Sequence, residues 1–194
     1  MSLLVDRVNA GLADRAQRLQ DSLASPARTT RTTVVIGRLL GAGFVLCMLT
    51  GLYSHFLQDP LPGMRFPTWP TNLYRFSQGL HVATGIACIP LLLAKLWSVY
   101  PLLFAFPPFR NLRQGLERAS IGVLIACAFV QLATGLLNTY QWYPFPWNFR
   151  SVHYALSWVI IGTLALHISV QLPKITRHWR DDRPVAAEHR RDAE

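Results

Sequence analysis

Four long stretches with almost no charged residues constrain this chain more than any other feature. They cover residues 33–56, 76–99, 119–138 and 151–172. The last two contain no Lys, Arg, Asp or Glu, and the first two contain only Arg38 and Lys95. An α-helix needs about 20 apolar residues to cross the ~30 Å hydrocarbon core of a bilayer. The sequence therefore predicts an all-α integral membrane protein in which residues 33–172 form a bundle of four transmembrane helices.

The positive charges predict how this bundle sits in the membrane. Most of the 19 Lys and Arg residues precede the first span, lie between the second and third, or follow the fourth. The two opposite loops contain only Arg65, Arg75 and Arg150. Because Lys and Arg near span ends stay in the cytoplasm, we expect cytoplasmic termini and a multi-pass protein of the bacterial inner membrane. The net charge of +9 then reflects topology, and nucleic acid is not an expected partner.

The two segments that flank the bundle are polar. In residues 1–32, apolar residues recur at helical spacing, at Leu4, Val8, Leu12, Leu19 and Leu23. This spacing predicts an amphipathic helix on the cytoplasmic membrane surface, although a solvated or partner-bound arm explains it equally well. Residues 173–194 are rich in charge and are predicted to form a cytoplasmic tail.

The outer loop at residues 140–149 is unusually aromatic. It contains Trp142, Tyr143, Phe145 and Trp147. Trp and Tyr favour the membrane interface, because their rings are apolar and their tips are polar. An interfacial belt is the expected role, and a docking surface for an extracytoplasmic partner is the alternative.

The three cysteines, Cys47, Cys88 and Cys127, all fall inside predicted spans and far apart in the sequence. Their spacing does not match that of metal ligands. We predict that they are small apolar core residues that form neither a disulfide nor a zinc site.

Histidine is rare inside membrane spans, where an ionisable side chain suggests a functional site. Four of the six histidines lie in or near spans, at His55, His81, His153 and His167. His153 and His167 are 14 residues apart, which puts them within about 40° of one helix face and roughly 21 Å apart along the axis. The predicted topology places His55, His81 and His153 in the outer half of the bundle and His167 alone in the inner half.

Two neutral imidazoles that face each other across a bundle are a common way to hold a low-spin haem iron. We expect His81 and His153 to be the ligands, with His55 and His153 as the second choice. A histidine hydrogen-bonded to a neighbouring helix is the alternative for each. Arg150, about one turn outward of His153, and Arg75, on the outward side of His81, are candidates to pair with haem propionates. Thr-Gly pairs recur in spans one to three, and glycine allows a helix or a flat macrocycle to approach closely.

The sequence resembles the bacterial cytochrome b561 superfamily, including the membrane b subunits of formate dehydrogenases and nickel-iron hydrogenases. The similar stretches are LTGLYSH, RFSQGLHVATG, LATGLLN and SVHYALSWVIIGTLALHISVQL. The resemblance implies a dihaem membrane cytochrome with the outer haem on His81 and His153. It also implies an inner haem on His167 and on a histidine near the start of span one. There the sequence is VVIGRLLGAG, which offers Gly37 and Arg38 instead.

The inner half therefore leaves alternatives open. His167 is expected to bind a haem with another ligand, to line a quinone pocket or to be structural, and Arg38 to pair with a propionate or a quinone oxygen. We expect one haem b, with two as the alternative. The chain also resembles membrane modules that accompany molybdopterin oxidoreductases of the sulfite oxidase type.

These observations predict an electron-transfer subunit without catalytic residues of its own. It would relay electrons between an extracytoplasmic redox subunit, of the molybdopterin type among others, and quinone. No Asp or Glu lies in any predicted span, which argues against a carboxylate proton relay. The alternatives are a haem-free membrane anchor of a redox complex and a stand-alone transmembrane reductase.

Overall fold

The computed structural model describes residues 2–104, 106 and 112–177. Within that range the side chains of residues 2–6, 103, 113, 173–175 and 177 are not described, so the side chain of Leu4 is outside the description. The predicted tail, residues 173–194, lies outside it beyond Arg177.

All the regular elements in the described part of the chain are helices. Its elements are α1 (Ser2–Ser22), α2 (Thr30–Gln58), α3 (Leu73–Val99), the short 3₁₀ helix η1 (Tyr100–Phe104), α4 (Leu112–Thr139) and α5 (Phe149–Arg177). The helices α2 to α5 are long and apolar enough to cross a membrane. The prediction of an all-helical protein with four membrane-capable helices is thereby confirmed.

Each long helix extends beyond the apolar run that predicted it, because the flanking polar residues continue the helix. At the start of α2, Thr29 caps the helix: its hydroxyl accepts a hydrogen bond of 3.0 Å from the backbone N–H of Thr32. Pro90 lies inside α3, and the helix continues through it. The two loops 59–72 and 140–148 lie at one end of the bundle, which we call outer after the predicted topology; the opposite end is called inner.

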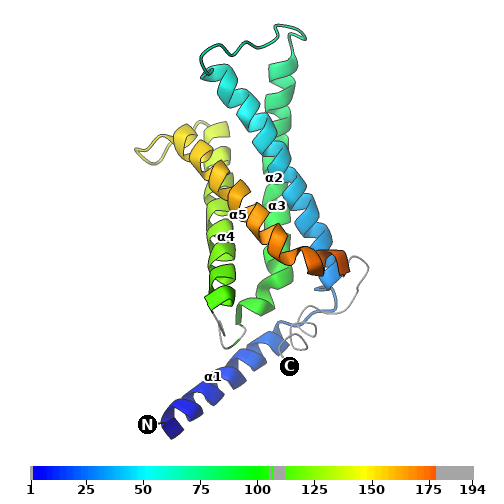
Figure 1. The fold of residues 1–194 in the computed structure, drawn as a ribbon, viewed down its shortest axis with the longest axis vertical. Helices are drawn as coiled ribbons and strands as arrows, with labels where there is room; N and C mark the ends of the chain where they lie inside the picture. Colours follow the sequence, from blue (N-terminus) through cyan, green and yellow to red (C-terminus); the bar gives the residue numbers. More distant parts are fainter. Residues whose placement is uncertain (1, 105, 107–111, 178–194) are drawn as a thin grey trace.

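The four long helices form two hairpins. Helix α2 packs chiefly against α3, and α4 packs chiefly against α5, as Figure 1 shows. Fewer contacts join the hairpins, through α3 with α4 and α2 with α5. The buried core lies where all four meet, at Leu40, Phe44, Cys88, Leu92, Ala128 and Ile160. Helix α1 projects obliquely from the inner end and contacts η1.

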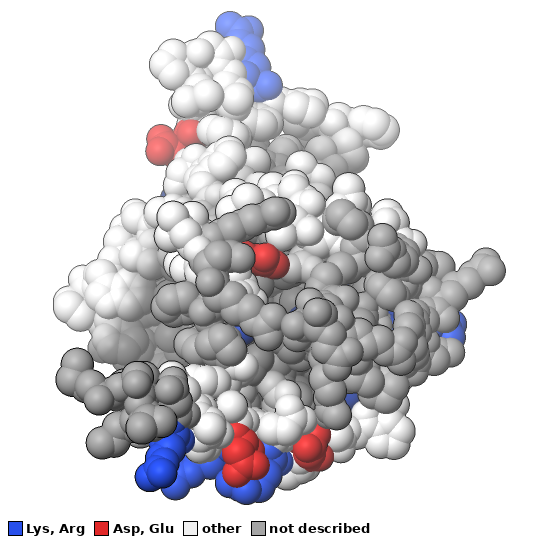
Figure 2. All heavy atoms as spheres, turned by 60° about the horizontal axis from the view of Figure 1, so that its bottom comes forward, with Lys and Arg blue, Asp and Glu red and all other residues white. Residues whose placement is uncertain are grey.

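Charged residues are rare along the four apolar runs, which contain only Arg38 and Lys95. In the space-filling view from the end that carries α1, groups of charged side chains lie at the near edge and at the distant tip (Figure 2). Large apolar side chains along the spans are exposed, among them Leu39, Leu49 and Phe129. Such a surface is favourable in lipid and unfavourable in water, which agrees with a membrane-embedded bundle.

Candidate functional site

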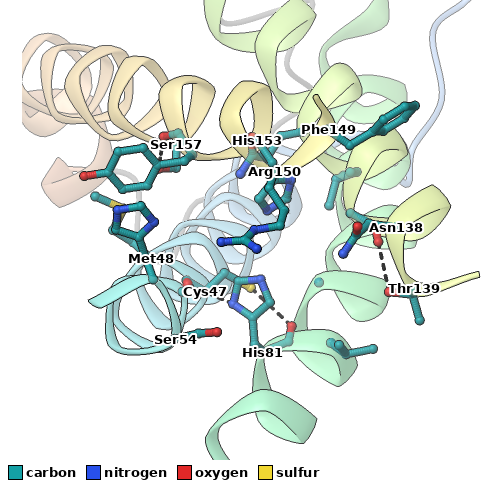
Figure 3. Close-up of a pocket in the computed structure, with 18 of the residues that line it drawn as sticks. Cys47, Met48, Ser54, His81, Asn138, Thr139, Phe149, Arg150, His153 and Ser157 are labelled. Atoms are coloured by element: carbon teal, nitrogen blue, oxygen red, sulfur yellow. Dashed lines mark hydrogen bonds between the residues drawn. The ribbon is translucent and has the colours of Figure 1, made fainter. Parts of the chain in front are cut away.

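His81 on α3 and His153 on α5 face each other across the bundle. Their ring centroids are 6.1 Å apart, and the two ring planes make an angle of 68°. The close-up in Figure 3 shows the two side chains entering one cavity from different helices. The packing of the two hairpins brings together residues that are 72 positions apart in the sequence.

Two groups of α2 determine which nitrogen of the His81 ring carries the proton. Nδ1 of His81 lies 3.0 Å from the backbone carbonyl oxygen of Cys47 and 3.1 Å from Oγ1 of Thr50. The Thr50 hydroxyl donates its own hydrogen to the carbonyl of Leu46, at 2.7 Å, so it accepts at the histidine. Because both neighbours of Nδ1 are acceptors, Nδ1 carries the proton and Nε2 keeps a free lone pair.

The second hairpin repeats this arrangement around His153. Nδ1 of His153 lies 3.1 Å from Oγ1 of Thr134, and the Thr134 hydroxyl donates to the carbonyl of Val130 at 2.8 Å. The ring also has a backbone hydrogen-bond partner at Gln131, three residues before the threonine, as Cys47 is before Thr50. Both histidines therefore present a lone-pair Nε2.

A glycine beside each threonine gives the imidazole room. A Cβ added at Gly51 would lie 3.1 Å from Cε1 of His81, and one added at Gly135 would lie 3.2 Å from Cε1 of His153. Most Cβ contacts in proteins are longer, so any larger residue would press on the ring. Two of the three Thr-Gly pairs thus position histidines. The third has another role, because the Thr84 methyl group packs against Gly43.

The two histidines line a cavity of about 670 Å³ that all four spans enclose. Its walls include the apolar side chains of Phe44, Val82, Leu132 and Ile160. Ligand and cofactor sites are typically cavities of about 300–1,000 Å³ with mostly apolar walls and a few well-placed polar groups. The cavity has the size and lining of a cofactor site.

The paired histidines fit a haem iron. Two metal–nitrogen bonds of about 2 Å each, together with the two ring radii, place ligand ring centres about 6 Å apart. The observed separation of 6.1 Å matches this spacing. Over the described residues there is no group of three or more His, Cys, Asp or Glu that could hold a metal ion. In a haem the macrocycle supplies the other ligands of an iron held by two histidines.

The structure places the other outer candidates around this pair. The His55 ring stacks on Tyr154, with centroids 3.9 Å apart and planes at 12°. His55 also lines the cavity. Arg150 lines it too, and Figure 3 shows its guanidinium reaching over the space between the histidines. Arg75 is exposed and is not among the lining residues.

The inner half has a different polar cluster. The ammonium of Lys95 donates to the carbonyl of Thr33 at 2.8 Å, and it lies 3.1 Å from where a Cβ at Gly37 would stand. His167 interacts electrostatically with Lys95 and Glu117, and Glu117 accepts a 2.6 Å hydrogen bond from Gln171. Nδ1 of His167 is buried and has no hydrogen-bond partner in the described part of the chain. No described contact brings a second imidazole to His167, and Arg38 is exposed on α2.

Sequence reasoning missed several residues of these two sites. It assigned the Thr-Gly pairs to the close approach of a helix or a macrocycle and not to histidine positioning, and it counted Lys95 only as a charge within a span. Cys47 precedes Thr50 by three residues, and Gln131 precedes Thr134 by the same number. This shared spacing was a sequence signal for the two groups that contact each histidine. It becomes informative only when the histidine that each threonine meets on the next helix is known.

Comparison with known proteins identifies the family of the chain. The family model described as prokaryotic cytochrome b561 matches residues 28–182, a range that includes all four spans. No curated protein and no solved structure gives a significant match. Since the family match covers most of the sequence, this chain belongs to the prokaryotic cytochrome b561 family, whose members are membrane cytochromes that bind b-type haem and transfer electrons.

Proposed function

We propose that this multi-pass inner-membrane protein is the electron-transfer subunit of an oxidoreductase complex and holds one b-type haem between His81 and His153. The observation that carries the proposal is the matched geometry of the two rings, 6.1 Å apart and each with Nδ1 bonded to acceptors. When bound, the haem supplies a one-electron ferric–ferrous couple whose potential depends on its ligands and surroundings.

The residues of the chain have separate tasks in this proposal. Thr50 and Thr134 hold the imidazoles in the ligand tautomer, which is how partners of a metal-binding histidine usually act. The apolar side chains of the wall lower the local dielectric constant around the iron. Arg150 reaches over the cavity and supplies a cation for a propionate.

The outer end is the proposed site of exchange with an extracytoplasmic redox partner. The polar residues Gln58, Asn138 and Asn148 line the cavity, and each lies at or beside the outer end of a span. Near them the aromatic side chains of Tyr140 and Trp142 are 74% and 63% exposed, which offers apolar surface for docking. The chain would then relay electrons between this partner and the quinone pool. Formate dehydrogenase, hydrogenase and molybdopterin-dependent subunits are the partner types that its sequence resemblance suggests.

A single haem is proposed because the described residues of the inner half place no second histidine against His167. His167 has Lys95, Glu117 and Gln171 as its polar surroundings. The Lys95 ammonium also lies against Gly37, in the part of span one where the resemblance leads one to expect a histidine. His167 is then a structural residue or part of a quinone pocket.

The test is a reduced-minus-oxidised spectrum of the purified protein with its haem-to-protein ratio. We expect one haem per chain, lost in His81→Ala and in His153→Ala. His55→Ala and His167→Ala are the matched controls and should keep the haem. His55 stacks on Tyr154, and His167 lies about 21 Å from His153 along the same helix. Full haem content in His81→Ala would instead favour His55 as the ligand.

Two outcomes would contradict the proposal in different ways. If the Soret and α bands do not change after expression with ample haem, the chain is a membrane anchor that binds no haem. Two haems per chain would favour a transmembrane reductase, and loss of one of them in His167→Ala would place it in the inner half.

A further inference from the structure

Aromatic rings at the end of the loop between α4 and α5 form a stack that leads inward from the surface. The Phe145 ring stacks on Trp147, with centroids 5.3 Å apart and planes at 11°, and Trp147 stacks on Phe149 at 4.5 Å and 18°. Phe145 is 53% exposed and Trp147 38%, whereas Phe149 is 4% exposed. The stack therefore has an exposed end and a buried end.

The buried end of the stack lies at the histidine cavity. Phe149 is the first residue of α5, and it is one of the residues that line the cavity. His153 follows Phe149 by four residues, so the two lie on the same face of the helix, one turn apart. The rings of Trp147 and Phe149 therefore connect the exposed loop with the wall of the cavity.

Exposed arginines accompany these rings at the outer end. The two outer loops and the helical turns beside them contain Arg65, Arg75 and Arg150, a single acidic residue, Asp59, and no lysine. All four charged side chains are exposed, and no ion pair joins any of them within the described residues. In the proposed function Arg150 pairs with a haem propionate, which leaves Arg65 and Arg75 as cations available to a partner.

This combination of residues is typical of a surface that binds another protein. Aromatic residues and Arg are enriched in protein–protein interfaces and Lys is depleted, and Trp, Tyr and Arg often dominate the binding energy. A surplus of positive charge favours an acidic partner, because opposite potentials steer two proteins together. A belt at the lipid interface is the other role for the rings. It predicts that a partner's charge has no effect.

We propose that these residues form a docking face for a one-electron redox protein that carries acidic residues around its cofactor. This outer docking face consists of Phe145, Trp147, Phe149, Arg65 and Arg75. The two loops that contribute to it belong to different hairpins at the outer end, so one partner can meet both (Figure 1). The proposal rests on the proposed function, because the partner exchanges its electron with the haem. One electron is transferred, so one iron or cofactor is oxidised and the other reduced, and no bond is broken.

The experiment uses two probes that share a cofactor and differ in charge. They are mitochondrial cytochrome c, whose haem edge is surrounded by lysines, and its succinylated form, in which these lysines carry carboxylates. The full-length protein in phosphatidylcholine nanodiscs is reduced and mixed with each oxidised probe in a stopped-flow instrument. At low ionic strength we expect the acidic probe to react about tenfold faster, and at high salt the difference should vanish. Equal rates at low salt, or a faster basic probe, would overturn the proposal.

Substitutions locate the docking face. Arg65→Gln and Arg75→Gln should each slow the acidic probe, and Trp147→Leu should slow both probes. Arg15→Gln removes the same charge from α1 at the inner end and is the matched control. Its rate should be unchanged, because the proposed haem lies in the outer half. An unchanged rate in any of the three outer variants, or a slower one in Arg15→Gln, would overturn the assignment.

A covalent test does not depend on haem. Arg75→Lys keeps the charge and introduces an amine, and the only lysines of the chain are Lys95, inside a span, and Lys174, near the inner end of α5. A zero-length carbodiimide should therefore join the acidic probe to position 75, and peptide mass spectrometry identifies the bond. A cross-link only at Lys174, or none at all, would overturn the outer site. If the protein contains no haem, the proposed function fails, and the cross-link still decides whether an acidic protein docks here.

Discussion

At the scale of single residues, the site depends on two threonines whose hydrogen-bonding role is fixed by the helix that carries them. A helical threonine commonly donates to the carbonyl four residues earlier, and Thr50 and Thr134 both do so. Their hydroxyls can then only accept at the neighbouring histidine. A common helix interaction thereby selects the imidazole tautomer that binds metal through Nε2.

Replacing these threonines by valine tests that role. Thr50→Val and Thr134→Val keep the shape of the side chain and remove the acceptor, so each should weaken haem binding by about 10- to 100-fold. The measurement is a haem titration of the apoprotein followed by its Soret band. Thr50→Ser and Thr134→Ser restore the hydroxyl and should bind nearly as tightly as the wild type. Equal affinity in the valine variants would show that the tautomer is held by the backbone alone.

The glycines beside the threonines give a steric prediction. Gly51→Ala places a methyl group 3.1 Å from Cε1 of His81, so the ring must move by a few tenths of an ångström. We expect a less stable haem complex, by about 1–3 kcal/mol, as for other overpacked sites. Gly41→Ala on the same helix meets nothing within 4 Å and is the control. Thermal release of haem from both variants measures the difference, and identical curves would refute the steric role.

At the scale of elements, the bundle consists of two hairpins with one design. In each hairpin the first helix carries Thr-Gly and the second carries the histidine that it holds. The hairpins differ at the positions three residues before each threonine, where Cys47 in one corresponds to Gln131 in the other.

Helix α1 gives a prediction at this scale. Its side chains at Val8, Leu12 and Leu19 are exposed and share one helix face, as a helix at a membrane surface requires. Leu12→Asp should loosen α1 from the bilayer and speed tryptic cleavage at Arg15 and Arg18 in nanodiscs. Ala13→Asp, which lies off this face, adds the same charge and is the control. Equal cleavage rates in the two variants would favour a solvated or partner-bound arm.

At the scale of the whole molecule, charge distribution and helix length decide how the protein sits in the membrane. The described charged residues lie mainly at the two ends, and the long helices between them expose apolar side chains. A charge in the hydrocarbon core is costly, so it needs partners inside the bundle. Lys95 is an example, since its ammonium bonds to the carbonyl of Thr33.

Topology is the prediction at this scale. A reporter domain that works only in the cytoplasm should be active when it is fused to either terminus. A reporter that works only outside the cytoplasm should be active when it is inserted in residues 59–72. The physical reason is the retention of Lys and Arg on the cytoplasmic side. Paired cytoplasmic and periplasmic reporters at each site provide the controls. An externally active reporter at the C-terminus would invert the assignment of inner and outer ends.

The sequence by itself determined the four membrane helices, their order and the family of the chain. Apolar run length is a local property, and a helix satisfies its backbone hydrogen bonds internally, so no tertiary information was needed. The helical spacing of His153 and His167 was predictable for the same reason, because both lie on one helix.

Only the tertiary structure decided which side chains meet between helices. Sequence spacing left both His55 and His81 as partners of His153; the packed bundle turns His81 toward His153 and stacks His55 on Tyr154. The contact of Gly43 with the Cys88 sulfur and that of Thr50 with His81 likewise depend on how α2 is rotated and shifted against α3. That register is set by close packing at small residues such as Gly43 and Gly51, and it is a property of two surfaces together.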